Sequence, residues 1–381
     1  MRNSCCIVFL VLIHLTKLVS AQFDNSSLKD SIPITSDNSR WIKLRVSNSV
    51  FMKDNEYFNR IATGYTFFGD MLNTSVTWNP NPFFRIQAGV FLRRDFGNDT
   101  IRQVIPEITM KAERNGFALI VGTLEGNLNH GIIQPMFDFE RYINKHVENG
   151  GQVLIKKKLF QSDTWIDWER MIYPGSNFNE VITAGFNLNG RIVNKPHWQI
   201  DIPVQGVIHH FGGQINSNQE GHIVTLWNES FGMRISWLHE QSFLKEIRLD
   251  NYYTYFKNLS PFKQSLDSIG HGTYLNVLFK SKFNIDLLIS YWNGQNYIAG
   301  IGGLLYQSQS SLDRNYYEPQ RELLLASLMY EKEWFPGFYV NLRFEPYYDF
   351  QNRLFEYSYG AYMIYKTEFK LVRLKRSSSD N

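Results

Sequence analysis

Apolar and polar residues alternate along most of this chain after residue 60, and this two-residue period limits the possible folds more than any other feature. Between residues 338 and 349, tyrosines and the polar residues Asn341, Arg343, Glu345 and Asp349 occupy the odd positions, whereas the even positions are apolar. Because successive side chains of a β-strand point to opposite faces, each such stretch predicts a strand with one apolar and one polar face.

The alternation predicts about sixteen strands. They lie near 39–48, 61–78, 83–96, 104–114, 117–124, 151–158, 163–172, 180–192, 197–210, 222–238, 243–257, 272–280, 283–292, 322–334, 338–349 and 354–372. Short turns largely follow the even-numbered strands, and long loops near 125–150, 211–221, 258–271 and 293–321 follow odd-numbered ones. Short turns at one rim and long loops at the other are typical of outer-membrane barrels. We therefore predict an all-β fold, a closed up-and-down antiparallel transmembrane β-barrel over residues 39–372.

The composition agrees with strands that have two opposed faces. Aromatic residues make up 15% of the chain, yet its mean hydropathy is only −0.31. A barrel that is apolar towards lipid and polar towards its lumen explains both values, because the average hides the two faces. No apolar run after the N-terminus is long enough for a transmembrane helix. The alternative fold is a secreted soluble β-sandwich that binds carbohydrate, but sandwich strands usually have only about 5 to 6 residues.

The N-terminus predicts export. Residues 1–21 combine a basic start, an apolar stretch and small residues before a cleavage point, as in a secretory signal peptide. Both cysteines, Cys5 and Cys6, lie in this leader, so the mature chain has no disulfide. Removal of Arg2 and Lys17 lowers the formal net charge from +3 to +1, which argues against nucleic acid as a partner. We expect residues 22–38 to be an N-terminal periplasmic extension and residues 373–381 a polar C-terminal tail.

Charged residues on the polar strand faces are expected to line the lumen. About sixteen strands leave room for an aqueous channel, in which opposed charges select small polar solutes. The alternative is that these charges only pair with one another and solvate the interior. The candidate pore-lining residues are Arg85, Arg93, Lys111, Glu113, Asp167, Glu169, Asp201, Arg343 and Glu345.

The stretch from Gly122 to Tyr142 is the most distinctive loop of the sequence. Its glycines permit sharp bends, and Asp138, Glu140 and Arg141 supply charge. Two arrangements remain open: the loop folds into the lumen as a constriction, or it packs at the rim.

Signals for catalysis or metal binding are weak. Asp167 and Glu169 share a strand face beside Trp165, which superficially suggests sugar hydrolysis, but acidic lumen residues explain the pattern better. His209 and His210 point to opposite faces of one strand, and His130 is isolated, so neither predicts a metal site. The sequence contains no hydrolase, zinc-protease or phosphate-loop motif. We therefore expect no catalysis, no cofactor and no metal.

Several short stretches resemble a known group of proteins. They are Gly122-Thr-Leu-Glu-Gly-Asn-Leu-Asn-His-Gly, Phe137-Asp-Phe-Glu-Arg, Glu148-Asn-Gly, Trp165-Ile-Asp-Trp-Glu and His210-Phe-Gly-Gly-Gln. They are similar to uncharacterised porin-like outer-membrane β-barrel proteins of Bacteroidetes-type bacteria. The resemblance covers most of the mature chain and implies a barrel in the outer membrane of a Gram-negative cell, without indicating a substrate. One departure is that a polar tail follows Phe369, where such chains usually end on an aromatic residue.

Three functions follow as hypotheses. The first is a porin-like barrel in the cell outer membrane that contacts lipid and lets small polar solutes pass or binds them. The second is a plugged surface barrel whose long loops bind a glycan or a partner. The third is a barrel enzyme acting on lipid or glycan, which would depend on Asp167 or Glu169. An oligomer is compatible with all three.

Overall fold

The computed structural model describes residues 23–31, 34, 39–212, 223–261, 268–313 and 315–374. The predicted signal peptide and most of the polar tail lie outside these residues. Sixteen strands occupy most of the described chain: β1 (Trp41–Glu56), β2 (Thr66–Asn81), β3 (Phe84–Asp95), β4 (Gln103–Arg114), β5 (Phe117–Thr123), β6 (Asn149–Lys156), β7 (Phe160–Arg170), β8 (Glu180–Asn194), β9 (Trp198–Gly212), β10 (Val224–Leu238), β11 (Leu244–Asn258), β12 (Ile269–Ser281), β13 (Ile285–Gln295), β14 (Gln320–Phe335), β15 (Phe338–Asp349) and β16 (Leu354–Arg373).

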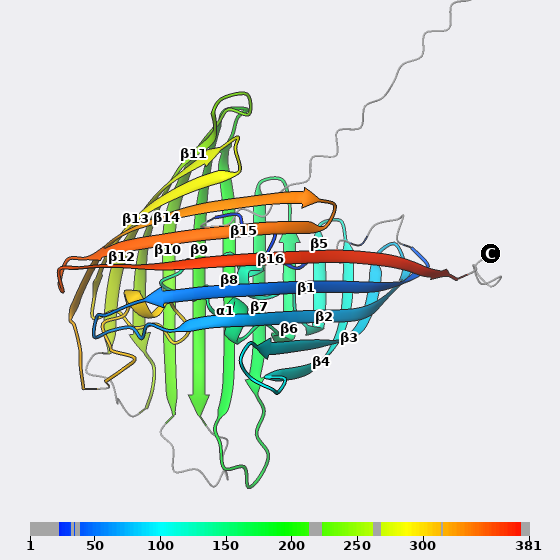
Figure 1. Cartoon of the computed structure of the whole chain (residues 1–381), viewed down its shortest axis with the longest axis horizontal. Helices are drawn as coiled ribbons and strands as arrows, with labels where there is room; N and C mark the ends of the chain where they lie inside the picture. The colour runs from blue at the N-terminus through cyan, green and yellow to red at the C-terminus, as the bar shows by residue number, and fades with distance from the viewer. Residues whose placement is uncertain are drawn as a thin grey trace, which may run out of the picture.

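Each strand pairs with its neighbours in sequence, and β1 pairs antiparallel with β16 to close the barrel. Figure 1 shows β16 (red) beside β1 (blue), with the strands of this wall crossing those of the far wall, as strand tilt in a barrel requires. The prediction of a closed antiparallel barrel of about sixteen strands is confirmed, and the alternative of a soluble sandwich is wrong. Closure gives every edge strand a partner, which a membrane-spanning sheet needs.

The first strand differs from its expected extent. β1 continues to Glu56, whereas the alternation predicted an end near residue 48. The last part of β1 carries Lys53 and Asn55 on its buried face and Asp54 and Glu56 on the other. The alternation is lost after residue 48 because Val50, Phe51 and Met52 put apolar side chains on both faces, and residues 53–56 then put polar side chains on both faces.

The two strand faces have the expected opposite character. Outward side chains are apolar and exposed, such as Ile108 (61%), Phe231 (59%) and Leu342 (45%). Inward side chains include buried charges, and Arg234 Nε lies 2.6 Å from Asp250 Oδ1 on the neighbouring strand. No helix in the described residues is long and apolar enough to span a membrane.

Two loops fold into the lumen and build an apolar core there. Residues 124–148, between β5 and β6, contain the short helices η2 (Asn127–His130) and α1 (Arg141–Asn144), and the loop between β13 and β14 contains η3 (Leu304–Tyr306). Ile133 and Met136 of the first loop share a buried cluster with Tyr297 of the second and with Trp292 of β13. The interior therefore has a hydrophobic core as well as polar walls.

Residues 23–31 also lie inside the barrel. Phe23 packs in a buried cluster with Leu278, Leu288 and Met329, which all face the lumen. Ser26 and Ser27 donate hydrogen bonds of 2.7 and 2.5 Å to the carboxylate of Glu331. The Asn25 side chain accepts a hydrogen bond from Arg343, and the Lys366 ammonium lies 2.6 Å from the carbonyl oxygen of Lys29. This segment falls in the range expected for a periplasmic extension, and it fills the lumen from the short-turn end.

Candidate functional site

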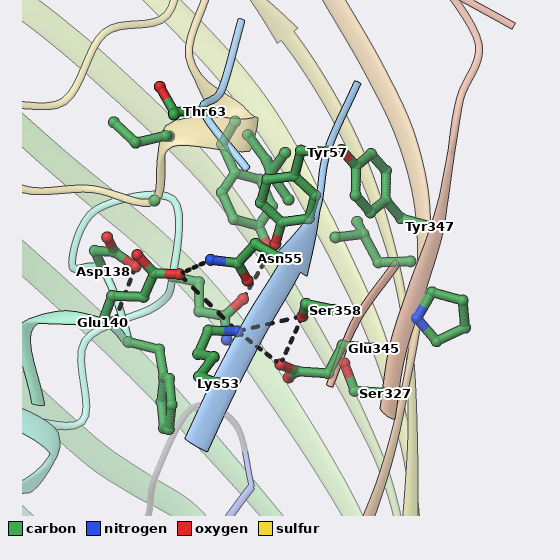
Figure 2. Close-up of a pocket in the computed structure, with 18 of the residues that line it drawn as sticks. Lys53, Asn55, Tyr57, Thr63, Asp138, Glu140, Ser327, Glu345, Tyr347 and Ser358 are labelled. Carbon is green, nitrogen blue, oxygen red and sulfur yellow. Dashed lines mark hydrogen bonds and ion pairs between the residues drawn. The ribbon is translucent and has the colours of Figure 1, made fainter. Parts of the chain in front are cut away.

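A cavity of about 680 Å³, including the space at its mouth, lies within the barrel near the long-loop rim. Its polar lining comes from elements far apart in the sequence, with Lys53 near the end of β1, Ser358 near the start of β16, Glu345 on β15, and Asp138 and Glu140 on the inward loop. Figure 2 shows these side chains converging from both sides of β1. Closure of the barrel thus brings the two ends of the chain to one site.

Lys53 is the centre of the polar cluster. Its buried ammonium lies 3.2 Å from Ser358 Oγ, 3.4 Å from Glu345 Oε2 and 4.0 Å from Glu140 Oε1. Ser358 Oγ in turn lies 3.4 Å from Glu345 Oε2. The site therefore holds a hydroxyl, an ammonium and a carboxylate in mutual contact, and it is largely removed from water. A buried charge of this kind needs such partners, because an unpaired one would be strongly destabilising.

The inward loop adds a pair of carboxylates, Asp138 and Glu140, to the cavity. Glu140 accepts hydrogen bonds from Asn55 Nδ2 at 2.6 Å and from the hydroxyl of Tyr65. Asp138 Oδ1 accepts the backbone N–H of Glu140 at 3.1 Å. Burial, together with the nearby charge of Glu140, raises the pKa of Asp138 to about 7. Asp138 can therefore give or take a proton near neutral pH, while Glu140 is held by hydrogen bonds.

This arrangement has the parts that acyl transfer requires. A serine hydroxyl becomes a nucleophile when an adjacent group accepts its proton. A fixed cation beside it stabilises the oxyanion of a tetrahedral intermediate. In the cavity, Ser358, Glu345 and Lys53 hold these three positions relative to one another.

His130 anchors the inward loop. Its Nε2 lies 2.7 Å from Glu148 Oε2, its Nδ1 lies 2.8 Å from Asp163 Oδ2, and its ring stacks on Trp165 at 3.6 Å. Although burial opposes the charge, the two carboxylates raise the pKa of His130 to about 9. Both nitrogens are engaged, so neither can act as a base. A Cβ at Gly126 would lie 2.4 Å from Glu148 Oε2, so the close approach of this carboxylate requires glycine.

The three constriction candidates of the loop, Asp138, Glu140 and Arg141, all lie in the lumen, but they do not share the same contacts. Asp138 and Glu140 line the cavity, whereas Arg141 Nη2 lies 2.9 Å from Glu169 Oε1 on the wall. Glu169 also accepts the hydroxyl of Thr183 at 2.7 Å. The loop therefore enters the lumen and is tied through Arg141 to Glu169 on β7, the neighbour of β6.

The nine candidate pore-lining residues lie on inward strand faces, and most of them contact a charged or polar partner. Arg85 and Lys111 both approach Glu125 of the inward loop, at 3.5 and 2.9 Å, and Lys111 also lies 2.9 Å from Glu113. The other contacts are Arg93 to Asp95 (2.8 Å), Arg191 to Asp201 (2.7 Å), Asn149 N to Asp167 (2.8 Å) and Arg343 to Asn341 (3.0 Å). Glu345 is the member of this set that lines the cavity.

His209 and His210 point to opposite faces of β9, as expected. His209 Nδ1 contacts Thr183 Oγ1 at 2.9 Å, and His210 Nδ1 contacts Thr225 Oγ1 at 2.9 Å. Within the described ranges no group of three His, Cys, Asp or Glu residues could hold a metal ion.

Sequence reasoning missed Lys53, Ser358 and the role of His130. Lys53 lies beyond the expected end of the first strand, and Ser358 is a single serine on a polar face. The alternation does mark Ser358 as inward, but only the register between β1 and β16 places it beside Lys53.

Solved structures with the same architecture are outer-membrane proteins. OprD from Pseudomonas aeruginosa is 7% identical with a TM-score of 0.51, covering 90% of this chain and 97% of that one. OccK2 (OpdF) from Pseudomonas aeruginosa is 9% identical with a TM-score of 0.50, covering 89% and 100%. The trimer form of OmpT from Vibrio cholerae is 8% identical with a TM-score of 0.49, covering 85% and 99%. The likeness of the first two to this chain shows the fold, a closed β-barrel of porin-like architecture.

A protein-family model also matches the chain. The family is described as Lipid A 3'-O-deacylase-type, and the match spans residues 34–374, which includes every strand of the barrel. A search of curated proteins found no match.

Proposed function

This chain belongs to the Lipid A 3'-O-deacylase-type family, and from that membership we propose that it is an outer-membrane hydrolase that removes an ester-linked acyl chain from a glycolipid of the lipid A type. The observation that carries the proposal is the contact of Ser358 with both Lys53 and Glu345 inside the cavity. The long-loop rim of an outer-membrane barrel faces the cell exterior. The cavity thus lies at the level where an outer-leaflet glycolipid would meet the barrel.

The expectation of a barrel without catalysis is wrong, because the family is named for an enzyme. The error has a physical cause. Alternation reports which face a side chain occupies, and a catalytic serine, lysine or glutamate on an inward face gives the same pattern as a residue that only solvates a lumen.

We assign the steps as follows. Ser358 Oγ attacks the ester carbonyl carbon, and its proton passes to Glu345, while the Lys53 ammonium stabilises the oxyanion. The intermediate collapses, the carbon–oxygen bond to the sugar breaks, and the leaving oxygen takes the proton from Glu345. Water then attacks the acyl-serine, with Glu345 again accepting and returning a proton, which releases the fatty acid and restores Ser358.

Passage of small polar solutes is the second candidate, and the porin-like architecture supports it. Against it, residues 23–31 and the inward loop occupy much of the described lumen and contact each other, since Asn129 Nδ2 lies 3.2 Å from the carbonyl oxygen of Asp30. Solutes would therefore need these segments to move. The role of Asp138, Glu140 and Arg141 as a constriction belongs to this second candidate function, the passage of solutes. Lipid contact, oligomer formation and an origin in Bacteroidetes-type bacteria remain expectations alongside it.

The test is release of fatty acid. Purified protein in detergent micelles is mixed with a lipid A-type glycolipid, and the products are followed by mass spectrometry. We expect loss of one acyl chain, and we expect Ser358→Ala to lower the rate by about 10⁶-fold, because it removes the nucleophile. The matched control is Ser290→Ala, an inward serine on β13 that contacts Asn276 and does not line the cavity. Equal rates for Ser358→Ala and the unmodified protein would contradict the assigned site, and no acyl release by the unmodified protein would contradict the function.

A further inference from the structure

The seam between β14 and β15 has an interruption in its hydrogen-bond ladder. Leu325 pairs with Tyr347 and Leu328 with Phe344, but Ala326 and Ser327 have no ladder partners between these pairs. The register is unchanged across the interruption. Its cause is Pro346, which stands opposite Ala326 and has no N–H to donate.

The cavity reaches the wall at this interruption. Its lining includes Ala326, Ser327, Glu345 and Pro346, the four residues that are not paired between β14 and β15. Strand alternation puts Ser327 and Glu345 on the inward face and Ala326 and Pro346 on the outward face. The cavity therefore borders the seam at the position of the interruption.

The surroundings of the interruption suit an apolar ligand on both sides. On the outer face, Leu324, Leu328 and Phe344 are 44%, 46% and 45% exposed, as expected for side chains that meet lipid. Ala326 stands between these two leucines on the same face of β14 and has a much smaller side chain. On the inner side, Leu305 and Leu325 line the cavity.

We infer that the cavity binds the acyl chain of a membrane lipid, and that the chain enters sideways through the β14–β15 seam at Ala326 and Pro346. This inference rests on the proposed function and deepens it. The ester group would follow its acyl chain inward and meet Lys53 and Ser358, while the sugar headgroup stays at the long-loop rim. A water-soluble ester would not need the seam, because it could enter from the rim.

Two variants narrow the seam without touching the polar cluster. Pro346→Val restores an N–H opposite the Ala326 carbonyl, and Ala326→Phe places a large apolar side chain over the outer face of the seam. The matched control is Pro203→Val, because Pro203 interrupts the β9–β10 ladder in the same way, between the pairs Phe231–Val204 and Arg234–Asp201. Pro203 does not line the cavity.

The experiment compares two substrates: a lipid A-type glycolipid embedded in phospholipid vesicles and p-nitrophenyl butyrate in solution. We expect both seam variants to lower acyl release from the embedded glycolipid at least tenfold, with hydrolysis of the soluble ester within twofold and the Pro203→Val variant unchanged. Equal loss on both substrates, or no loss on either, would overturn the seam as the entrance.

A binding measurement separates this inference from the proposed function. Vesicles that contain a phospholipid with a diazirine on its acyl chain are irradiated with the full-length protein and with Ser358→Ala. We expect cross-links on the inward residues Leu305 and Leu325, and their loss in Ala326→Phe. Such cross-links without acyl release would support the binding site and refute the hydrolase. Cross-links confined to outward residues would refute the binding site, whether or not fatty acid is released.

Discussion

The ammonium of Lys53 lies 3.2 Å from the hydroxyl of Ser358, although 305 positions separate the two residues in the chain. Lys53 stands opposite Gly360 and Ser358 opposite Asn55 in the β1–β16 register, so the contact is diagonal across the closing seam of the barrel. The proposed site therefore exists only when the barrel is closed.

Replacement of Lys53 tests its assigned role. We expect Lys53→Met to lower the rate of acyl release by about 100-fold, because the oxyanion loses its fixed positive charge. The matched control is Lys43→Met, on the same strand, whose ammonium pairs with Glu368 away from the cavity. Mass spectrometry of released fatty acid gives the rates. A fall of the same size in both variants would mean that the loss reflects general damage to β1.

Asp138 should make the stability of the inward loop depend on pH. The pKa of Asp138 in the folded loop is about 7, above the ordinary value of 3.8. At a pH between these two values, the carboxyl is protonated in the folded loop and ionised in the unfolded one. The stabilisation is complete below about pH 4 and is lost as the pH rises through about 7. Hydrogen exchange of residues 124–148 between pH 4 and 8 should show this loss, and Asp138→Asn should remove it. Asp99→Asn, on an exposed loop, should leave the profile unchanged; persistence of the profile in Asp138→Asn would contradict the assignment.

His130 should stabilise the same loop over a different pH range. Its folded pKa of about 9 exceeds the ordinary 6.5, so the contribution is complete below about pH 6.5 and is lost as the pH rises through about 9. We expect His130→Gln to destabilise the loop by about 3 kcal/mol near pH 6, because Glu148 and Asp163 lose their cation. Hydrogen exchange measures the effect, with His197→Gln at an exposed turn as the control. If hydrogen exchange of residues 124–148 stays slow in the His130→Gln variant at pH 6, His130 does not anchor the loop.

The N-terminal segment should seal the lumen. We expect little conductance from the intact barrel in planar bilayers and a large increase after deletion of residues 23–31. Glu331→Ala, which removes the acceptor for Ser26 and Ser27, should give an intermediate increase. Glu333→Ala is the control, since Glu333 contacts the turn at Gly337 and not the segment. Large conductance before deletion would contradict the seal.

Much of the wall was predictable from the sequence, because alternation depends on local order alone. Arg343 and Glu345 were placed on a polar face, and the structure has both facing inward. The long strand β16 was expected over 354–372 and spans Leu354–Arg373. Lipid and lumen impose opposite polarity on neighbouring residues, so a strand that meets both carries a strong periodic signal.

The site was not predictable in the same way. Lys53, Ser358 and Asp138 lie on three elements whose contact depends on barrel closure and on the path of one loop. His130 seemed isolated because its partners Glu148 and Asp163 are 18 and 33 positions away. Periodicity carries no information about such pairings, and a single sequence contains no other local record of them.

The hydrophobic core inside the lumen should also give this barrel a distinctive calorimetric behaviour. A barrel filled with water transfers few apolar groups from water on folding, since its outward side chains stay among lipid or detergent chains. Here Ile133, Met136, Trp292 and Tyr297 are buried together inside the wall. Their exposure on unfolding would add a positive heat-capacity change, as in a water-soluble globular protein. The lumen of this barrel thus behaves thermodynamically like a small globular protein enclosed by a membrane protein.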